Sequence, residues 1–157
     1  MTIGEQEGTM EEKRKVVMIG SARGTSAVIN DTEYYFLYDG YALFRIQEEF
    51  GAGILPELSL REPGSAERIL RVSEILTEQG AAKCKKYSID APAFKKSLFE
   101  EIDVMPYMYM DLQKACMDAA NIGFEREAQD EDEEIDLILL KRQKKTDISG
   151  QSISKTE

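Results

Sequence analysis

The sequence contains no histidine, and Cys84 and Cys116 are its only cysteines. One chain therefore cannot build a metal site from imidazole and thiolate ligands. Its serines and cysteines have no imidazole to activate them, and no Gly-x-Ser-x-Gly element occurs. We expect two buried thiols in a protein without catalytic residues, metal or cofactor, and hence not an enzyme.

Long apolar runs and an excess of positive charge are also absent. No apolar run approaches the roughly 18 to 20 residues that a membrane-spanning helix needs, and the first residues of the chain are mostly polar and charged, unlike a signal peptide. The 30 acidic and 20 basic residues give a net charge of -10, which repels nucleic-acid phosphates and anionic membranes. We expect a cytoplasmic protein that binds neither nucleic acid nor membranes.

The chain is long enough for one domain with loose ends, because a chain of about 150 residues buries roughly two-thirds of its unfolded surface. Residues 1–14 mix glycine, glutamate, lysine and threonine without periodicity, which predicts a flexible leader. Small and polar residues predominate after residue 146, which predicts a disordered tail over residues 146–157. A single domain is expected over residues 15–145.

Three short segments at the front of this domain have the composition of β-strands. Residues 15–20, 26–30 and 33–38 are rich in branched and aromatic side chains, and a turn-forming Asn-Asp-Thr sequence joins the second segment to the third. The glycine-containing residues 20–24 lack the Gly-Lys-Ser/Thr ending of a phosphate-binding loop and are interpreted as a turn. These segments predict a small antiparallel sheet over residues 15–38.

The hydrophobic period lengthens after Asp39, from the spacing of a strand to that of a helix. Leu43, Ile46 and Phe50 recur three and four residues apart, as on one face of an amphipathic helix. Asp39 is the expected N-cap, and Gly51 is the expected left-handed residue at the end.

A second helix is predicted to begin at Ser65, its expected N-cap. In one interpretation this helix ends at Gly80. In the other it continues to about Tyr87 and tolerates the glycine at a cost of about 1 kcal/mol. Two further helices are predicted over residues 90–102 and 103–123, because Pro-containing sequence opens each of them.

The last segment, over residues 125–145, has a strongly polarised charge. Seven acids lie between Glu125 and Glu134, and four bases follow an apolar stretch. A helix would place the acids at its positive end and the bases at its negative end, so a short terminal helix is predicted. The predicted fold class is α+β, with a small N-terminal antiparallel sheet followed by four to five helices over residues 39–145. The predicted core consists of Tyr34, Phe36, Leu43, Ile46, Phe50, Ile69, Val72, Leu76, Leu98, Leu112 and Cys116.

The stretch "VMPYMYMDLQKACMDAA" holds four of the seven methionines. On a helix, Tyr107, Met110 and Met117 lie off the face that the core can take. Either both faces are buried because the helix is central, or the second face is an adaptable surface for apolar partners, which flexible methionine suits. The expected core face of this helix consists of Met105, Tyr109, Leu112, Cys116 and Ala120.

The apolar residues that follow the acidic run present the same choice. They either dock on their own domain or form an adhesive helix for a partner. We therefore take as candidate partner-binding residues Tyr107, Met110, Met117, Ile138 and Leu139.

A strand hairpin written "VINDTEYYFLYDGYALFRIQEEFG", followed by helical sequence with "RILRVSEILTEQG" and a variable acidic end, resembles the small tail assembly chaperones of long-tailed phages and prophages. The resemblance covers residues 16–145. It implies a protein that holds the apolar tape-measure protein soluble in the host cytoplasm and is missing from the finished virion. The major tail protein is a further candidate partner, and self-association stays open.

The resemblance also implies two forms of the protein, because such chaperones are often extended by ribosomal frameshifting. The adjacent codons of Lys144 and Lys145 are the candidate slippage site. The residues alone favour a second function equally: an acidic adaptor or inhibitor that neutralises a basic partner through its acidic run.

Overall fold

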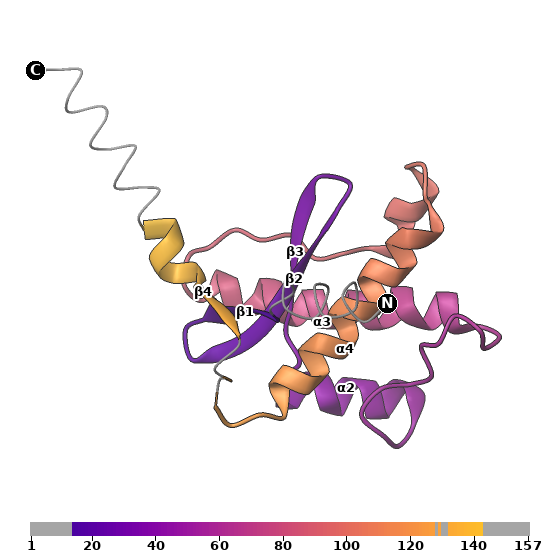
Figure 1. The fold of residues 1–157 in the computed structure, drawn as a ribbon, viewed down its shortest axis with the longest axis horizontal. Coiled ribbons are helices and arrows are strands. Elements are labelled where there is room, and N and C mark those ends of the chain that lie inside the picture. The colour runs from indigo at the N-terminus through magenta and orange to yellow at the C-terminus, as the bar shows by residue number, and fades with distance from the viewer. Residues whose placement is uncertain (1–13, 128, 130–131, 143–157) are drawn as a thin grey trace, which may run out of the picture.

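The computed structural model describes residues 14–127, 129 and 132–142. Three predicted features lie outside these described residues: the tail over residues 146–157, the leader except for its last residue, and the Lys144–Lys145 pair. The α+β fold with its N-terminal sheet is confirmed (Figure 1). The elements are β1 (Lys15–Ile19), β2 (Ala22–Ile29), β3 (Thr32–Phe36), α2 (Gly40–Phe50), α3 (Ser65–Lys85), the 3₁₀ helix η1 (Lys96–Glu100), α4 (Pro106–Gly123) and β4 (Glu133–Asp136).

The sheet has the strand order β3-β2-β1-β4. The first three strands pair antiparallel, as predicted, with Val17 opposite Gly24 and Ala27 opposite Tyr34. The turn between β2 and β3 places Asn30 in the left-handed region, with φ of 53°, which asparagine tolerates. The expected break over residues 20–24 is shorter than predicted, because β2 already begins at Ala22 and contains Gly24.

The predicted terminal helix is wrong over residues 133–136, which form β4 parallel to β1. The Glu133 amide donates a hydrogen bond to the Arg14 carbonyl at 2.8 Å, so β4 covers the backbone edge of β1 that β2 leaves open. The chain turns helical at residue 137. Asp136, the one acid of the apolar stretch, caps this turn by accepting a hydrogen bond from the Leu139 amide at 3.0 Å.

The ends of α2 follow the sequence signals. The Asp39 carboxylate accepts a hydrogen bond from the Ala42 amide at 2.9 Å, and Gly51 has φ of 96°. In α3 the continuous interpretation is confirmed, because the helix passes through Gly80 to Lys85. The predicted cap of α3 is wrong: Ser65 is the buried first residue of the helix, and Gly64, with φ of 79°, is the N-cap.

The helix predicted over residues 90–102 is replaced by irregular chain and the short η1. Buried polar side chains of α3 bind the backbone amides of this segment. Thr77 accepts a hydrogen bond from the Phe94 amide at 2.8 Å, and Glu74 accepts one from the Lys96 amide at 2.8 Å. These contacts hold residues 94–96 against α3. Helix α4 ends at Gly123 as predicted but begins at Pro106, three residues later than the predicted start at residue 103.

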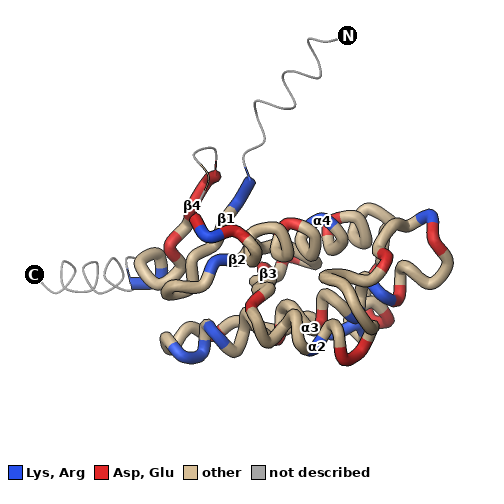
Figure 2. The backbone as a smooth tube through the Cα atoms, turned by 90° about the horizontal axis from the view of Figure 1, so that it is seen from below, with Lys and Arg blue, Asp and Glu red and all other residues tan. Residues whose placement is uncertain are grey.

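The main core fills the space between the β2–β3 hairpin, α3, α2 and α4. Figure 2 shows α4 on one side of this hairpin and α3 with α2 on the other. Eight of the predicted core residues are buried, and Leu43, Phe50 and Leu98 are only partly buried at its rim. A second cluster joins the sheet, the end of α3 and the C-terminal helical turn, and it consists of Val17, Ile19, Tyr35, Cys84, Ile89 and Leu137.

Candidate partner-binding surface

Helix α4 has one buried face and one exposed face. Leu112, Cys116 and Ala120 are buried as predicted, and Met108 is buried in place of Met105, which is exposed at the N-cap position just before the helix. The exposed face carries a row of side chains that we call the α4 stripe. The α4 stripe consists of Tyr107, Met110, Lys114, Met117, Asn121 and Phe124, the last at the C-cap.

The three candidate residues of this stripe are exposed. Tyr107 is 61%, Met110 56% and Met117 47% accessible to solvent. The interpretation in which both faces of the helix are buried is therefore wrong. Large apolar side chains held in water along one helix face are typical of an interaction surface.

The remaining two candidate residues lie elsewhere. Leu139 is 51% exposed, but Ile138 is partly buried against the second core cluster. Figures 1 and 2 place residues 137–142 beyond β4, away from the N-terminal half of α4. The candidate residues therefore occupy two surfaces and do not form one site.

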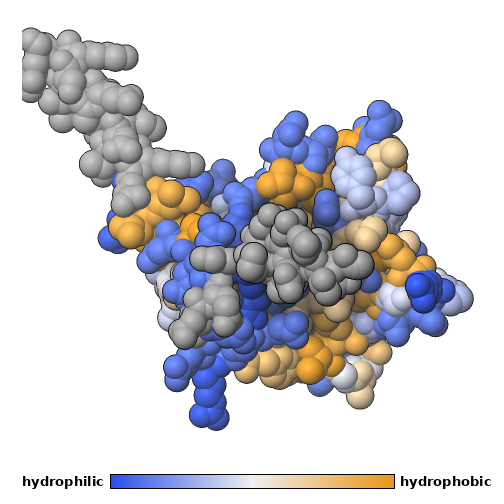
Figure 3. Space-filling view, in the orientation of Figure 1, coloured by the Kyte–Doolittle hydropathy of each residue, from blue (hydrophilic) through white to orange (hydrophobic). Residues whose placement is uncertain are grey.

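Helix α2 adds two aromatic side chains that the sequence analysis did not select. Tyr41 and Phe44 are both exposed and stack with their ring centroids 6.1 Å apart. The ring of Tyr38, a buried residue just before α2, lies with its centroid 5.9 Å from that of Phe124 at the end of the α4 stripe. Figure 3 shows hydrophobic residues along the lower edge of the molecule, over α2. The sequence does contain a signal for this pair: Tyr41 and Phe44 are three residues apart, as on one helix face, and neither belongs to the core-facing residues of α2.

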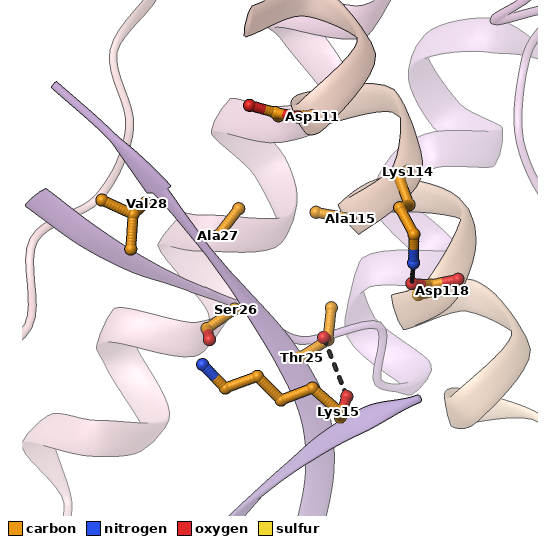
Figure 4. Close-up of a pocket in the computed structure, with 9 residues that line it drawn as sticks. All are labelled: Lys15, Thr25, Ser26, Ala27, Val28, Asp111, Lys114, Ala115 and Asp118. Carbon is orange, nitrogen blue, oxygen red and sulfur yellow. Dashed lines mark hydrogen bonds and ion pairs between the residues drawn. The ribbon is translucent and has the colours of Figure 1, made fainter. Parts of the chain in front are cut away.

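A groove of about 260 Å³ runs between β2 and one flank of the α4 stripe (Figure 4). Thr25 closes one end by donating a hydrogen bond to the Lys15 carbonyl at 2.9 Å. On the α4 side, Asp111 and Asp118 lie on either side of Lys114, whose ammonium contacts Asp118 at 2.7 Å. The groove therefore offers charged groups for recognition next to an apolar row.

Part of the acidic run has a structural role. The Arg14 guanidinium donates two hydrogen bonds to Glu125, both at 2.7 Å, and two to Asp132, at 2.9 and 2.7 Å. Arg14 thereby lowers the pKa of both carboxyl groups. These contacts hold the chain between α4 and β4 against the start of β1, so these two acids are not available to a partner.

Replacing Arg14 with glutamine is expected to lower the free energy of unfolding at pH 7 by about 2 kcal/mol, because charge-assisted hydrogen bonds are lost. Since the carboxyl pKa values are lowered in the folded state, this contribution is complete above their ordinary values of 4.5 for Glu125 and 3.8 for Asp132. It disappears as the pH falls through the lowered values. Thermal unfolding of both proteins between pH 7 and pH 2 tests this: a gap between them that stays constant contradicts the role of Arg14.

A second charged region lies at the far end of the molecule. Figure 2 shows basic residues at the C-terminal end of α3 and at the end of residues 137–142. None of these cations makes an ion pair within the part of the chain that the structure describes. Two of them, Lys141 and Arg142, line a cavity of about 380 Å³ together with Tyr87, Ser88 and Ile89. The basic residues are Lys83, Lys85, Lys86, Lys141 and Arg142.

The part of the chain that the structure describes offers neither a reactive thiol nor a cluster of metal-ligating side chains. Both cysteines are free and buried, as predicted, and burial raises the pKa of Cys84 to about 11 and that of Cys116 to about 12. Thiols with such pKa values stay protonated and unreactive at neutral pH. Residues 14–127, 129 and 132–142 contain no group of three potential metal ligands and no helix long and apolar enough to cross a membrane.

Comparison with protein families, curated proteins and solved structures finds no match. The function is therefore argued from the surface itself.

Proposed function

We propose that this protein is a tail assembly chaperone of long-tailed phages that binds the tape-measure protein and keeps it soluble in the cytoplasm during assembly. The observation that carries the proposal is the exposure of Tyr107, Met110 and Met117 on one face of α4. A second exposed apolar pair, Tyr41 and Phe44, stacks on α2. The family assignment comes from the resemblance of the sequence.

The physical properties of the domain suit a protein that holds an apolar client. Methionine side chains are flexible and polarizable, so they repack around different apolar sequences. The net charge of -10 keeps the domain, and a complex with its client, apart from other copies. The proposed chaperone binds its client noncovalently, catalyses no reaction, and is released before the virion is complete.

The acidic adaptor has less support. Glu125 and Asp132, two of the seven acids in the run, are bound to Arg14. An inhibitor that mimics nucleic acid needs acids spread over an open face, whereas these two carboxylates stabilise the chain's own fold.

The test is co-expression of the tape-measure protein with a variant that carries Tyr107→Ser, Met110→Ser and Met117→Ser. We expect this variant to fold with a free energy of unfolding within about 1 kcal/mol of the wild type, because exposed positions tolerate substitution. The tape-measure protein should move from the soluble fraction to the pellet. Leu139→Ser, on the separate surface, is the matched control and should keep the client soluble.

Two results contradict the proposal. A folded triple variant that still keeps the client soluble places the binding surface elsewhere. A wild-type protein that leaves the tape-measure protein insoluble refutes the chaperone assignment itself.

A further inference from the structure

The α4 stripe has the spacing of a coiled-coil seam. Its six residues follow one another at intervals of three, four, three, four and three, which is the 3.5-residue period of a heptad repeat. The residues with this spacing lie on the exposed face of α4, and the opposite face of the helix packs against the core. From Tyr107 to Phe124 the stripe is about 25 Å long, at 1.5 Å per helical residue. A partner helix of about 18 residues can lie along it.

We propose that the α4 stripe binds one helix of the client protein, in coiled-coil geometry, and that this helix carries basic residues along the flank that faces Asp111 and Asp118. The inference rests on the proposed function, because it names the part of the client that the chaperone binds. Tyr107, Met110 and Met117 supply the apolar contacts of the seam.

Two polar residues interrupt the apolar row. Lys114 and Asn121 are seven residues apart and occupy the same position of successive heptads. Polar residues at such positions fix the register and orientation of the partner at a cost in stability. The client helix therefore binds in one register, with a polar or acidic residue opposite Lys114.

The two flanks of the seam differ in charge. On the groove side, Asp111 and Asp118 each follow an apolar residue of the stripe by one position (Figure 4). On the other side, Gln113 donates a hydrogen bond to the Leu58 carbonyl at 2.7 Å, and Ala120 is buried. The two acids thus lie on one flank, where Asp118 is paired with Lys114 and Asp111 is exposed with no ion pair among the described residues. Asp111 is therefore the group on this flank that attracts lysine or arginine.

The same charges disfavour a second copy of this chain as the occupant. In an antiparallel pair about a two-fold axis between Lys114 and Met117, Asp111 of each copy faces Asp118 of the other. In a parallel pair, Lys114 faces its own counterpart. Both arrangements oppose like charges, and each copy carries a net charge of -10. A different helix with basic flanking residues avoids this repulsion.

Two designed peptides of 21 residues provide the test. Both have leucine at the seam positions except for one asparagine opposite Lys114, and their flanking positions are all lysine in one and all glutamate in the other. Fluorescence anisotropy with the full chain at low salt measures binding. We expect the wild type to bind the lysine peptide about tenfold more tightly than the glutamate peptide, the size of effect that one exposed ion pair with lysine and the matching repulsion of glutamate give together.

Charge-reversal variants distinguish the effect of the flank on peptide preference from the effect of the protein's overall net charge. The variant Asp111→Lys/Asp118→Lys should prefer the glutamate peptide. Glu48→Lys/Glu101→Lys makes the same change in net charge at two exposed positions that are not part of the stripe or its flank, and it should keep the wild-type preference. Asp111→Lys alone leaves the Lys114–Asp118 contact intact and should give an intermediate ratio, so it decides the question if circular dichroism shows that the double variant is unfolded.

The outcomes distinguish this inference from the proposed function. If the wild type binds neither peptide, or if both double variants shift the preference equally, the helix-binding seam is refuted even though the tape-measure protein stays soluble. A concentration-dependent dimer in sedimentation that Met117→Ser abolishes also overturns it, because a second copy then covers the stripe. If the peptides discriminate as expected while the tape-measure protein aggregates, the seam stands and the chaperone assignment fails.

Discussion

Replacing Phe94 with alanine is expected to lower the free energy of unfolding by about 3 to 5 kcal/mol, the range for truncating a large buried aromatic side chain. Phe94 is fully buried. Its ring makes edge-on contacts with Tyr34, at a centroid distance of 5.7 Å, and with Phe99, at 5.4 Å. Because the segment around it lacks regular backbone hydrogen bonding, this side chain anchors the segment between α3 and α4 to the core.

Phe44 provides a matched control, because it is the same residue type on an exposed face of α2. Phe44→Ala should change stability by less than about 1 kcal/mol. Urea denaturation followed by circular dichroism measures both variants. Equal midpoints for the two would show that Phe94 is not a core residue.

Phe94 also shows where the sequence pattern stops being informative. Its apolar spacing with Leu98 and Ile102 is that of a helix, but Thr77 and Glu74 of α3 bind the backbone amides of this segment. These acceptors lie 17 and 22 residues earlier in the chain, so no local pattern reveals them. By contrast, the Asp39 cap and the ends of α2 depend on neighbouring residues, and the sequence predicts them correctly.

Contacts between residues far apart in the sequence also explain why the sequence does not predict β4. Residues 133–136 contain three acids and one isoleucine, a composition with low β-propensity. The pairing of Val17 with Ile135 and the contact of Arg14 with Asp132, 118 residues apart, fix this segment against β1. Long-range backbone pairing therefore outweighs local propensity here.

For the candidate surface, helical periodicity alone places Tyr107, Met110 and Met117 on the outer face of α4. The assignment of Met105 fails because this residue precedes the helix, which begins at Pro106, and does not follow its phase. Grouping Ile138 and Leu139 with the α4 residues also fails, because their distance in space depends on where β4 packs.

Replacing Gly80 with alanine is expected to destabilise the protein by about 1 to 3 kcal/mol or more, through overpacking. An added Cβ would overlap the carbonyl oxygen of Tyr35 and lie 2.8 Å from its carbonyl carbon. These are backbone atoms of β3. The pairing of β3 with β2 and the hydrogen bond from the Leu37 amide to the Leu76 carbonyl, at 3.1 Å, keep β3 from moving away from α3.

Gly40→Ala is the matched control for this prediction. Gly40 is the first residue of α2, and an added Cβ there meets no atom within 4 Å. Alanine has the higher helix propensity and reduces the entropy of the unfolded chain, so this variant should be more stable by up to about 1 kcal/mol.

The same propensity and entropy terms favour alanine at Gly80, so any loss of stability in that variant must come from the contact between α3 and β3. Urea denaturation of the two glycine variants should therefore give changes of opposite sign. If Gly80→Ala is as stable as the wild type or more so, α3 lies farther from β3 than the structure places it, and the close approach that lets the helix continue through Gly80 to Lys85 is wrong.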